Sequence, residues 1–171
     1  MPVQRLNHAV LYVRDVPRSV AFYSEVLGFR QVMGGPTAAF LQAEGSTNDH
    51  DLGLFQIGPD ATDSPAGTTS VGLYHLAWEV DTLDELERIA DALSRHGALA
   101  GASDHSTTKA LYAKDPDGLE FEVSWLVPSD LLTDDVLAGR ASVRRLDLAR
   151  DKARYGGATR GGVGVSVASA R

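Results

Sequence analysis

The chain has 171 residues, of which 43% are hydrophobic and 23% charged, a composition typical of one compact globular domain. Its net charge of −7 and isoelectric point near 5.1 argue against nucleic acid as a partner. The chain contains no cysteine, which excludes disulfides, thiolate metal ligands and cysteine nucleophiles.

Targeting signals are absent from the sequence pattern. The first five residues include one arginine, but no apolar run follows that charge, so they do not resemble a signal peptide. No stretch approaches the roughly 20 apolar residues that a transmembrane helix requires. We therefore expect a soluble, cytoplasmic protein that has no membrane partner.

The first half of the chain predicts one strand, one helix and three further strands. Residues 5–13 loosely alternate apolar and polar side chains and predict the first strand. Asp15 can cap a helix that ends at Gly28, with Pro17 in its first turn. A Gly-Gly-Pro turn at 34–36 separates two of the strands that follow. These three strands are predicted at 29–34, 37–43 and 52–57.

The second half repeats this order of elements. A polar loop at 58–70 precedes a predicted strand at 73–80. Thr82 and Glu85 form a capping-box pattern that opens a helix, and Gly97 ends it. Three more strands are predicted at 98–104, 108–114 and 119–127. A duplicated β-α-β-β-β unit is therefore the main organising feature of the chain.

A C-terminal extension follows the duplicated part. We predict a single domain over residues 1–130, with modules at about 5–58 and 72–127, and an extension over 131–171. Within the extension, residues 142–155 alternate basic and acidic side chains and predict a helix packed on the outside. The glycine-rich tail from Gly156 is expected to be flexible.

Two histidines occupy matching positions in the two modules. His8 and His75 share the pattern L-x-H-x-x-x-x-V and lie 67 residues apart. Glu122 closes the second module, seven residues after Asp115 in an Asp-Pro-Asp-Gly turn sequence. Two imidazoles and one carboxylate are the ligands of a facial-triad metal site, which leaves coordination positions open for substrate. The competing interpretation is that both histidines are hydrogen-bonded core residues and that Glu122 is solvated.

The duplicated unit with its paired histidines resembles the vicinal oxygen chelate superfamily, which includes glyoxalases, bleomycin-resistance proteins and dioxygenases. The resemblance covers residues 5–127. It implies an α+β fold in which two βαβββ modules curl their sheets into one cup-like barrel around a metal site, followed here by a C-terminal helical tail. It also implies that His8, His75 and Glu122 are the metal ligands.

Three further residues resemble those of one-domain type I extradiol catechol dioxygenases. His50 stands in a His-Asp-x-x-Leu setting, and Tyr112 lies ten residues before Glu122. In that branch His50 would be the acid–base residue, while His105 and Tyr112 would contact substrate or oxygen. A histidine that titrates near neutrality suits the proton transfers of a catechol. The alternative interpretations are that His50 is an ordinary polar loop residue and that Tyr112 only packs against its neighbours.

The resemblance also implies the cofactor and the partners. Dioxygen chemistry requires a reducible metal with open positions, so Fe(II) is expected first and Mn(II) is the alternative. The other partners are a small aromatic diol and O₂. Exposed sheet edges favour a homodimer or a larger homo-oligomer.

Other members of the superfamily remain alternative interpretations. A glyoxalase-like isomerase would need a carboxylate as a fourth metal ligand on the strand at 52–57, and this strand has none. A fosfomycin-type thiol transferase uses the same triad, so the triad does not exclude it. A metal-free binding or resistance protein typically lacks the ligand residues. His96, at a predicted helix end, is interpreted as structural.

Overall fold

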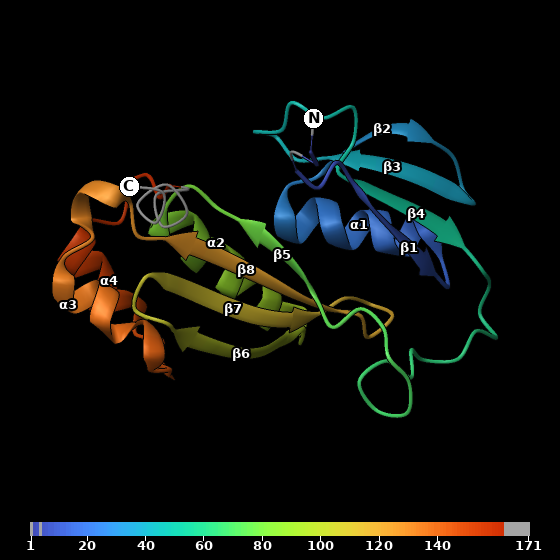
Figure 1. Cartoon of the computed structure of the whole chain (residues 1–171). Coiled ribbons are helices and arrows are strands. Elements are labelled where there is room, and N and C mark those ends of the chain that lie inside the picture. The colour runs from blue at the N-terminus through green and yellow to red at the C-terminus, as the bar shows by residue number, and fades with distance from the viewer. Residues whose placement is uncertain (1, 4, 163–171) are drawn as a thin grey trace. The chain divides into compact units, whose positions relative to one another are not determined.

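The computed structural model describes residues 2, 3 and 5–162 of this α+β chain (Figure 1). It divides into two compact units. The first comprises residues 1–64 with 115–118, and the second comprises 65–114 with 119–171. Each unit contains a mixed open β-sheet and a helix that packs on it. No helix among the described residues is long and apolar enough to cross a membrane.

The first unit contains the predicted strand, helix and three strands. In chain order they are β1 (Ala9–Val13), α1 (Val16–Leu27), β2 (Arg30–Gly34), β3 (Ala38–Gln42) and β4 (Leu52–Gln56). The sheet order is β1-β4-β3-β2, with β1 parallel to β4 and the other pairs antiparallel. Asp15 caps α1 by accepting a hydrogen bond from the Arg18 N–H, and Gly28 ends it with φ 73°.

The Asp-Pro-Asp-Gly turn belongs to the first unit, although its sequence lies in the second half. The Asp117 carboxylate accepts hydrogen bonds from the Arg14 N–H at 3.1 Å and from its guanidinium at 3.0 Å. The buried Tyr23 hydroxyl lies 3.1 Å from Oδ2 of Asp115. Burial, followed by the charge of Asp115, raises the pKa of Tyr23 well above its ordinary value, so the phenol stays protonated.

The second unit repeats the topology of the first. Its elements are β5 (Leu76–Glu79), α2 (Leu83–Arg95), β6 (Leu99–Asp104), β7 (Thr108–Lys114) and β8 (Glu120–Leu126). The sheet order is β5-β8-β7-β6-β9, and β5 runs parallel to β8 as β1 does to β4. The predicted helix start is confirmed, because the Thr82 hydroxyl accepts from the Glu85 N–H as an N-cap, and His96 lies at the helix end as expected.

Buried and more exposed side chains alternate along most of β8. Phe121, Val123 and Trp125 are buried on the side that α2 covers, whereas Glu120 and Glu122 lie on the opposite face of the strand. That second face of the sheet is therefore the one that carries the candidate chemistry.

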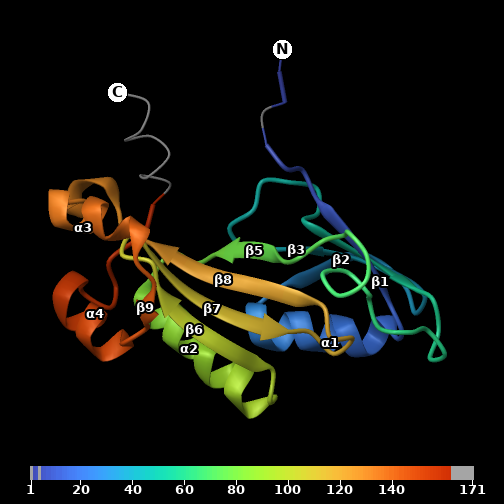
Figure 2. The ribbon, with the colours of Figure 1, turned by 60° about the horizontal axis from the view of Figure 1, so that its bottom comes forward.

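The C-terminal extension differs from its prediction. It contains η1 (Ser129–Leu131), α3 (Asp134–Ala138), η2 (Gly139–Ala141), β9 (Arg144–Arg145) and α4 (Leu148–Tyr155) (Figure 2). The prediction of a single helix over 142–155 is wrong, because Arg144 and Arg145 pair with β6 and Asp147 caps a shorter helix. Such pairing is non-local, so charge alternation alone did not reveal it.

The first part of the glycine-rich tail is anchored to the second unit. The Gly157 carbonyl accepts a hydrogen bond from the Asp84 N–H at 3.0 Å, and the Gly161 N–H donates to the Asp81 carbonyl at 2.6 Å. The Thr159 carbonyl accepts from the Trp125 indole at 3.2 Å. Flexibility was expected from Gly156, but these bonds hold the tail through Gly161. Residues 163–171 of the predicted tail lie outside the described residues.

Candidate functional site

In the first unit, His8 and His50 lie side by side. Each precedes a strand rather than lying in one, because β1 begins at Ala9 and β4 at Leu52. Those two strands are parallel with Ala9 opposite Leu52, so the residues just before them are neighbours. The two imidazole rings are 4.6 Å apart between centroids, and Phe40 packs edge-on against His50 at 4.9 Å.

Local hydrogen bonds orient these two imidazoles. Nδ1 of His8 lies 2.7 Å from the Asn7 side-chain oxygen, and Nδ1 of His50 lies 3.0 Å from the Asp49 carboxylate. Asp51 fastens the loop, because its carboxylate accepts hydrogen bonds from the Ala43 N–H and from other loop side chains. Nε2 of each ring is then the nitrogen that could bind a metal or exchange a proton.

In the second unit, the predicted residues share one face of the sheet. Tyr112 on β7 is directly opposite Glu122 on β8, and His75 is the residue before β5. Nε2 of His75 lies 3.4 Å from Oε2 of Glu122. The rings of His75 and Tyr112 are 6.3 Å apart between centroids. The structure thus brings an imidazole, a carboxylate and a phenol together.

His105 joins this group from the turn between β6 and β7. Its Nε2 lies 2.9 Å from the Tyr112 hydroxyl, a hydrogen-bond distance. Burial first, and then the charge of Glu122, raises the pKa of Tyr112 above its ordinary value. The Tyr112 hydroxyl therefore remains protonated near neutral pH and can donate a hydrogen bond.

The surroundings of His75 and Glu122 fit metal ligands better than core packing. The His75 side chain is 26% exposed and faces a carboxylate, so it is not a core histidine, and its buried Nδ1 has no hydrogen-bond partner among the described residues. Two ligand atoms about 2.1 Å from one metal ion and at right angles lie about 3 Å apart, close to the observed 3.4 Å. No three His, Cys, Asp or Glu side chains of the described residues form a ready metal cluster. His8 belongs to the first unit, so its place in a triad stays a prediction.

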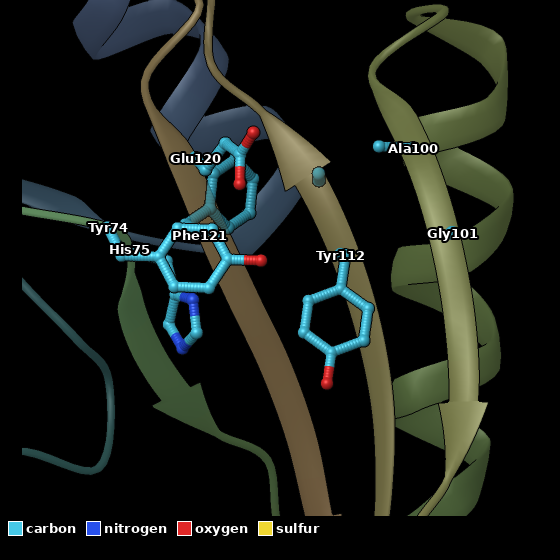
Figure 3. Close-up of a pocket in the computed structure, with 8 residues that line it drawn as sticks. Tyr74, His75, Ala100, Gly101, Tyr112, Glu120 and Phe121 are labelled. Carbon is cyan, nitrogen blue, oxygen red and sulfur yellow. The ribbon is translucent and has the colours of Figure 1, made fainter. Parts of the chain in front are cut away.

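A pocket of about 260 Å³ adjoins His75 and Tyr112 in the second unit (Figure 3). Tyr74, His75 and Glu120 lie on one side of Tyr112 in this view, and Ala100 and Gly101 lie on the β6 side. Its lining residues are Tyr74, His75, Ala100, Gly101, Tyr112, Ala113, Glu120 and Phe121.

Gly101 keeps this pocket open on the β6 side. It is paired with Tyr112 next to an irregularity in the strand register. A Cβ atom at Gly101 would meet no atom within 4 Å, so neither packing nor a left-handed backbone requires glycine there. Sequence reasoning missed both Gly101 and Tyr74. A glycine inside a predicted strand is a signal for such an opening, and Tyr74 adjoins a predicted ligand.

The repeat also shows what stands in place of Glu122 in the first unit. In the second unit Ala77, two residues after His75, pairs with Glu122. In the first unit Val10, two residues after His8, pairs with Gly53, so Gly53 corresponds to Glu122. A Cβ atom at Gly53 would lie 3.3 Å from a methyl carbon of Val10. The first unit therefore presents no carboxylate at this position, as the sequence indicated.

Comparisons with known proteins match this chain to one family. Residues 5–123 match the Glyoxalase/Bleomycin resistance protein/Dioxygenase superfamily. The chain is 33% identical over 118 residues to a catechol-2,3-dioxygenase of Bacillus subtilis, a match that covers 69% of this chain and 40% of that protein. It is 32% identical over 116 residues to biphenyl-2,3-diol 1,2-dioxygenase 3 of Rhodococcus globerulus, a match that covers 67% of this chain and 59% of that protein. It is also 28% identical over 125 residues to the metallothiol transferase FosB of Lysinibacillus sphaericus, covering 71% and 82%. The chain thus spans only part of the two dioxygenases.

Solved structures support the same fold. A glyoxalase/bleomycin resistance protein/dioxygenase domain from Frankia has a TM-score of 0.57 at 22% identity, covering 72% of this chain and 92% of the domain. The fosfomycin resistance protein FosX from Mesorhizobium loti has a TM-score of 0.53 at 21% identity, with the same coverage. Likeness at this level of identity concerns the fold, which enzymes of different activity share.

Proposed function

Because this chain belongs to the Glyoxalase/Bleomycin resistance protein/Dioxygenase superfamily, we propose that it is an extradiol dioxygenase that cleaves a catechol-type diol with O₂. The observation that carries the proposal is the hydrogen-bonded pair of His105 and Tyr112, at 2.9 Å, on the sheet face that also bears His75 and Glu122. This combination supplies a hydrogen-bonding pair beside two metal-type ligands. The two dioxygenase relatives add support.

The proposed metal centre consists of His8, His75 and Glu122. In this proposal the first unit supplies one imidazole, and the second supplies an imidazole and a carboxylate. Nitrogen and oxygen donors of this kind suit Fe(II), with Mn(II) as the alternative. The metal would supply a redox-active centre with open coordination positions.

The remaining predicted residues would handle protons and orientation. A catechol must release protons when its two oxygens bind, and we assign His50 to accept and return a proton. The protonated Tyr112 hydroxyl, bonded to His105, would donate a hydrogen bond to an oxygen that gains negative charge. Both atoms of O₂ enter a muconic semialdehyde-type product, so the overall reaction needs no external reductant.

The pocket beside His75 and Tyr112 would accept the body of the substrate. An apolar cavity of about 150 Å³ can hold benzene, and a water-sized group occupies about 30 Å³. The 260 Å³ found here therefore has room for one aromatic ring and on the order of four further groups. A catechol with a short substituent fits this volume.

A thiol transferase is the second candidate, and one observation favours it. The match to FosB covers 82% of that protein, more than the match to either dioxygenase covers. That chemistry uses the same proposed triad, but it gives no role to His50, His105 and Tyr112 together. A glyoxalase-like isomerase is disfavoured because it would need a carboxylate as a fourth metal ligand, and Gly53 occupies that place.

The test is an activity assay that separates these candidates. The protein is loaded with Fe(II) or Mn(II) without air and then mixed in air with catechol, 3-methylcatechol or 2,3-dihydroxybiphenyl. We expect a yellow ring-fission product that requires the metal. Loss of a thiol in the presence of fosfomycin, without any ring fission, would replace the proposal with the transferase.

A further inference from the structure

A cluster of buried charges lies directly beside the turn that carries His105. Lys109 and Asp104 are each only 1% exposed, and the Lys109 ammonium lies 2.5 Å from Oδ1 of Asp104. The same ammonium donates to the Ser106 carbonyl at 3.1 Å. Charges are seldom buried to this extent, because each loses its hydration and needs close partners. The cluster therefore joins both ends of the turn through strong, directional bonds.

The C-terminal extension supplies the other half of this cluster. Arg150 on α4 donates to Oδ2 of Asp104 at 2.9 Å. Asp151, which is 1% exposed, places Oδ2 at 3.7 Å from the Lys109 ammonium. Arg144 on β9 lies 3.5 Å from the Asp104 carboxylate. Residues more than thirty positions further along the chain thus surround the turn.

The turn itself is held in an unfavourable backbone conformation. Ser106 has a φ of 68°, the one positive value for a residue other than glycine among the described residues. Its N–H donates to Oδ1 of Asp104 at 2.8 Å, and its hydroxyl donates to the Val136 carbonyl of α3 at 2.8 Å. A Cβ atom on Gly139 would lie 2.5 Å from the Ser106 hydroxyl oxygen. Such a conformation persists only where the surroundings determine it strongly.

We propose that the C-terminal extension, of which the structure describes residues 131–162, holds the His105 turn so that His105 meets the Tyr112 hydroxyl. In this view Asp104 and Lys109 are positioning residues that act through His105. The catalytic consequence rests on the proposed function, whereas the placement of the His105 ring does not. A displacement of about 1 Å in a catalytic group can cost on the order of 10²-fold in rate, so the extension would influence turnover without touching substrate.

Gly139→Ala is the most direct test. Gly139 has φ −67° and ψ −11°, which alanine adopts readily, so the new methyl group meets resistance only from Ser106. We expect unchanged metal content, a fall of about 10- to 100-fold in kcat, and shifted NMR signals of the His105 ring. Adding Ser106→Gly removes the obstructing side chain and suits the positive φ, so the double variant should regain the His105 signals and most of the rate. Gly45→Ala is the matched control, because a Cβ there meets nothing within 4 Å.

A second perturbation covers the case in which Gly139→Ala does not fold. Arg150→Ala removes one partner of Asp104 from an exposed position, and Arg154→Ala on the same helix is its control. We expect altered His105 signals and a several-fold lower kcat for Arg150→Ala alone. Unchanged His105 signals in both Gly139→Ala and Arg150→Ala, or a Gly139→Ala defect that Ser106→Gly leaves in place, would overturn the inference. If the wild-type protein cleaves no catechol, the proposed function fails, while the NMR measurements still decide the inference.

Discussion

His75 is the side chain whose surroundings are hardest to explain by packing. It is partly buried, its Nδ1 has no hydrogen-bond partner among the described residues, and its Nε2 faces the Glu122 carboxylate at 3.4 Å. A buried polar atom without a partner is costly in a folded protein. A metal ion bound by Nε2 of His75 and by the Glu122 carboxylate would account for the 3.4 Å approach of these two groups.

Glu122→Gln tests this interpretation, and Glu120→Gln is its control. Both residues lie on β8 and on the same face of the sheet, but Glu120 pairs with the exposed Lys114 rather than with His75. Replacing the Glu122 carboxylate by a neutral amide should abolish Fe(II) or Mn(II) binding. Glu120→Gln should bind about one metal ion per chain, as should the wild type. Metal titration by calorimetry without air measures both, and equal affinities would contradict the assignment.

His50→Ala separates proton transfer from metal binding. His50 packs between His8 and Phe40 but is not one of the proposed ligands. We expect the variant to retain metal and to lose about 10²- to 10⁴-fold in kcat, the usual contribution of an acid–base residue. His96→Ala, at the exposed end of α2, should retain the full rate. A His50→Ala variant with wild-type turnover would return His50 to the role of a polar loop residue.

Gly101→Val tests the size of the substrate pocket. The valine side chain should enter the pocket beside Tyr112, because Gly101 lines the pocket and a Cβ atom there meets nothing within 4 Å. We expect kcat/KM for 4-ethylcatechol to fall at least tenfold relative to that for catechol. Gly45→Val, in an equally open place in the first unit, should leave the ratio unchanged. An unchanged ratio for Gly101→Val would mean that the substrate lies elsewhere.

At the scale of the secondary-structure elements, the same ion-pair chemistry has two different consequences. Lys109 on β7 is buried and joins the β6–β7 turn to α4, whereas Lys114 at the end of β7 is exposed and pairs with Glu120 at 3.6 Å. Removing one partner of a buried pair leaves an uncompensated charge, but an exposed pair contributes little.

Lys109→Met should therefore lower the free energy of unfolding by about 3–5 kcal/mol. Lys114→Met, on the same strand, should change it by less than about 1 kcal/mol. Chemical denaturation followed by circular dichroism measures the two variants side by side. Equal effects would mean that the buried cluster does not fasten the extension to the sheet.

Element prediction succeeded where the signals are local. The caps at Asp15 and Thr82 and the glycine at Gly28 mark helix ends within a few residues, and the structure confirms them. The extension was harder, because Arg144 and Arg145 form β9 only through pairing with β6. The bonds that anchor residues 156–161 also come from distant parts of the second unit. Composition alone indicates flexibility there.

At the scale of the whole molecule, the duplication distributes the candidate chemistry over two units. Each unit places one histidine just before its first strand. The parallel pairing of that strand determines which side chain lies beside the histidine, His50 in the first unit and Glu122 in the second. The paired histidines could be singled out from the sequence because they recur in a fixed frame, and Glu122 because it follows the Asp-Pro-Asp-Gly turn sequence; their role as metal ligands stays a prediction. The contact of His105 with Tyr112 and the opening at Gly101 depend on strand register, which the motif pattern alone did not reveal.

Oxygen consumption during catechol turnover tests the central proposal most directly. In an oxygen electrode, the Fe(II)-loaded wild-type protein should consume one O₂ for each catechol converted to ring-opened product, because both oxygen atoms enter that product. The same preparation of His75→Ala should consume none above background. Metal binding by the wild type with no catechol-dependent oxygen uptake, or equal uptake by His75→Ala, would contradict the assignment of this protein as a metal-dependent ring-cleaving dioxygenase.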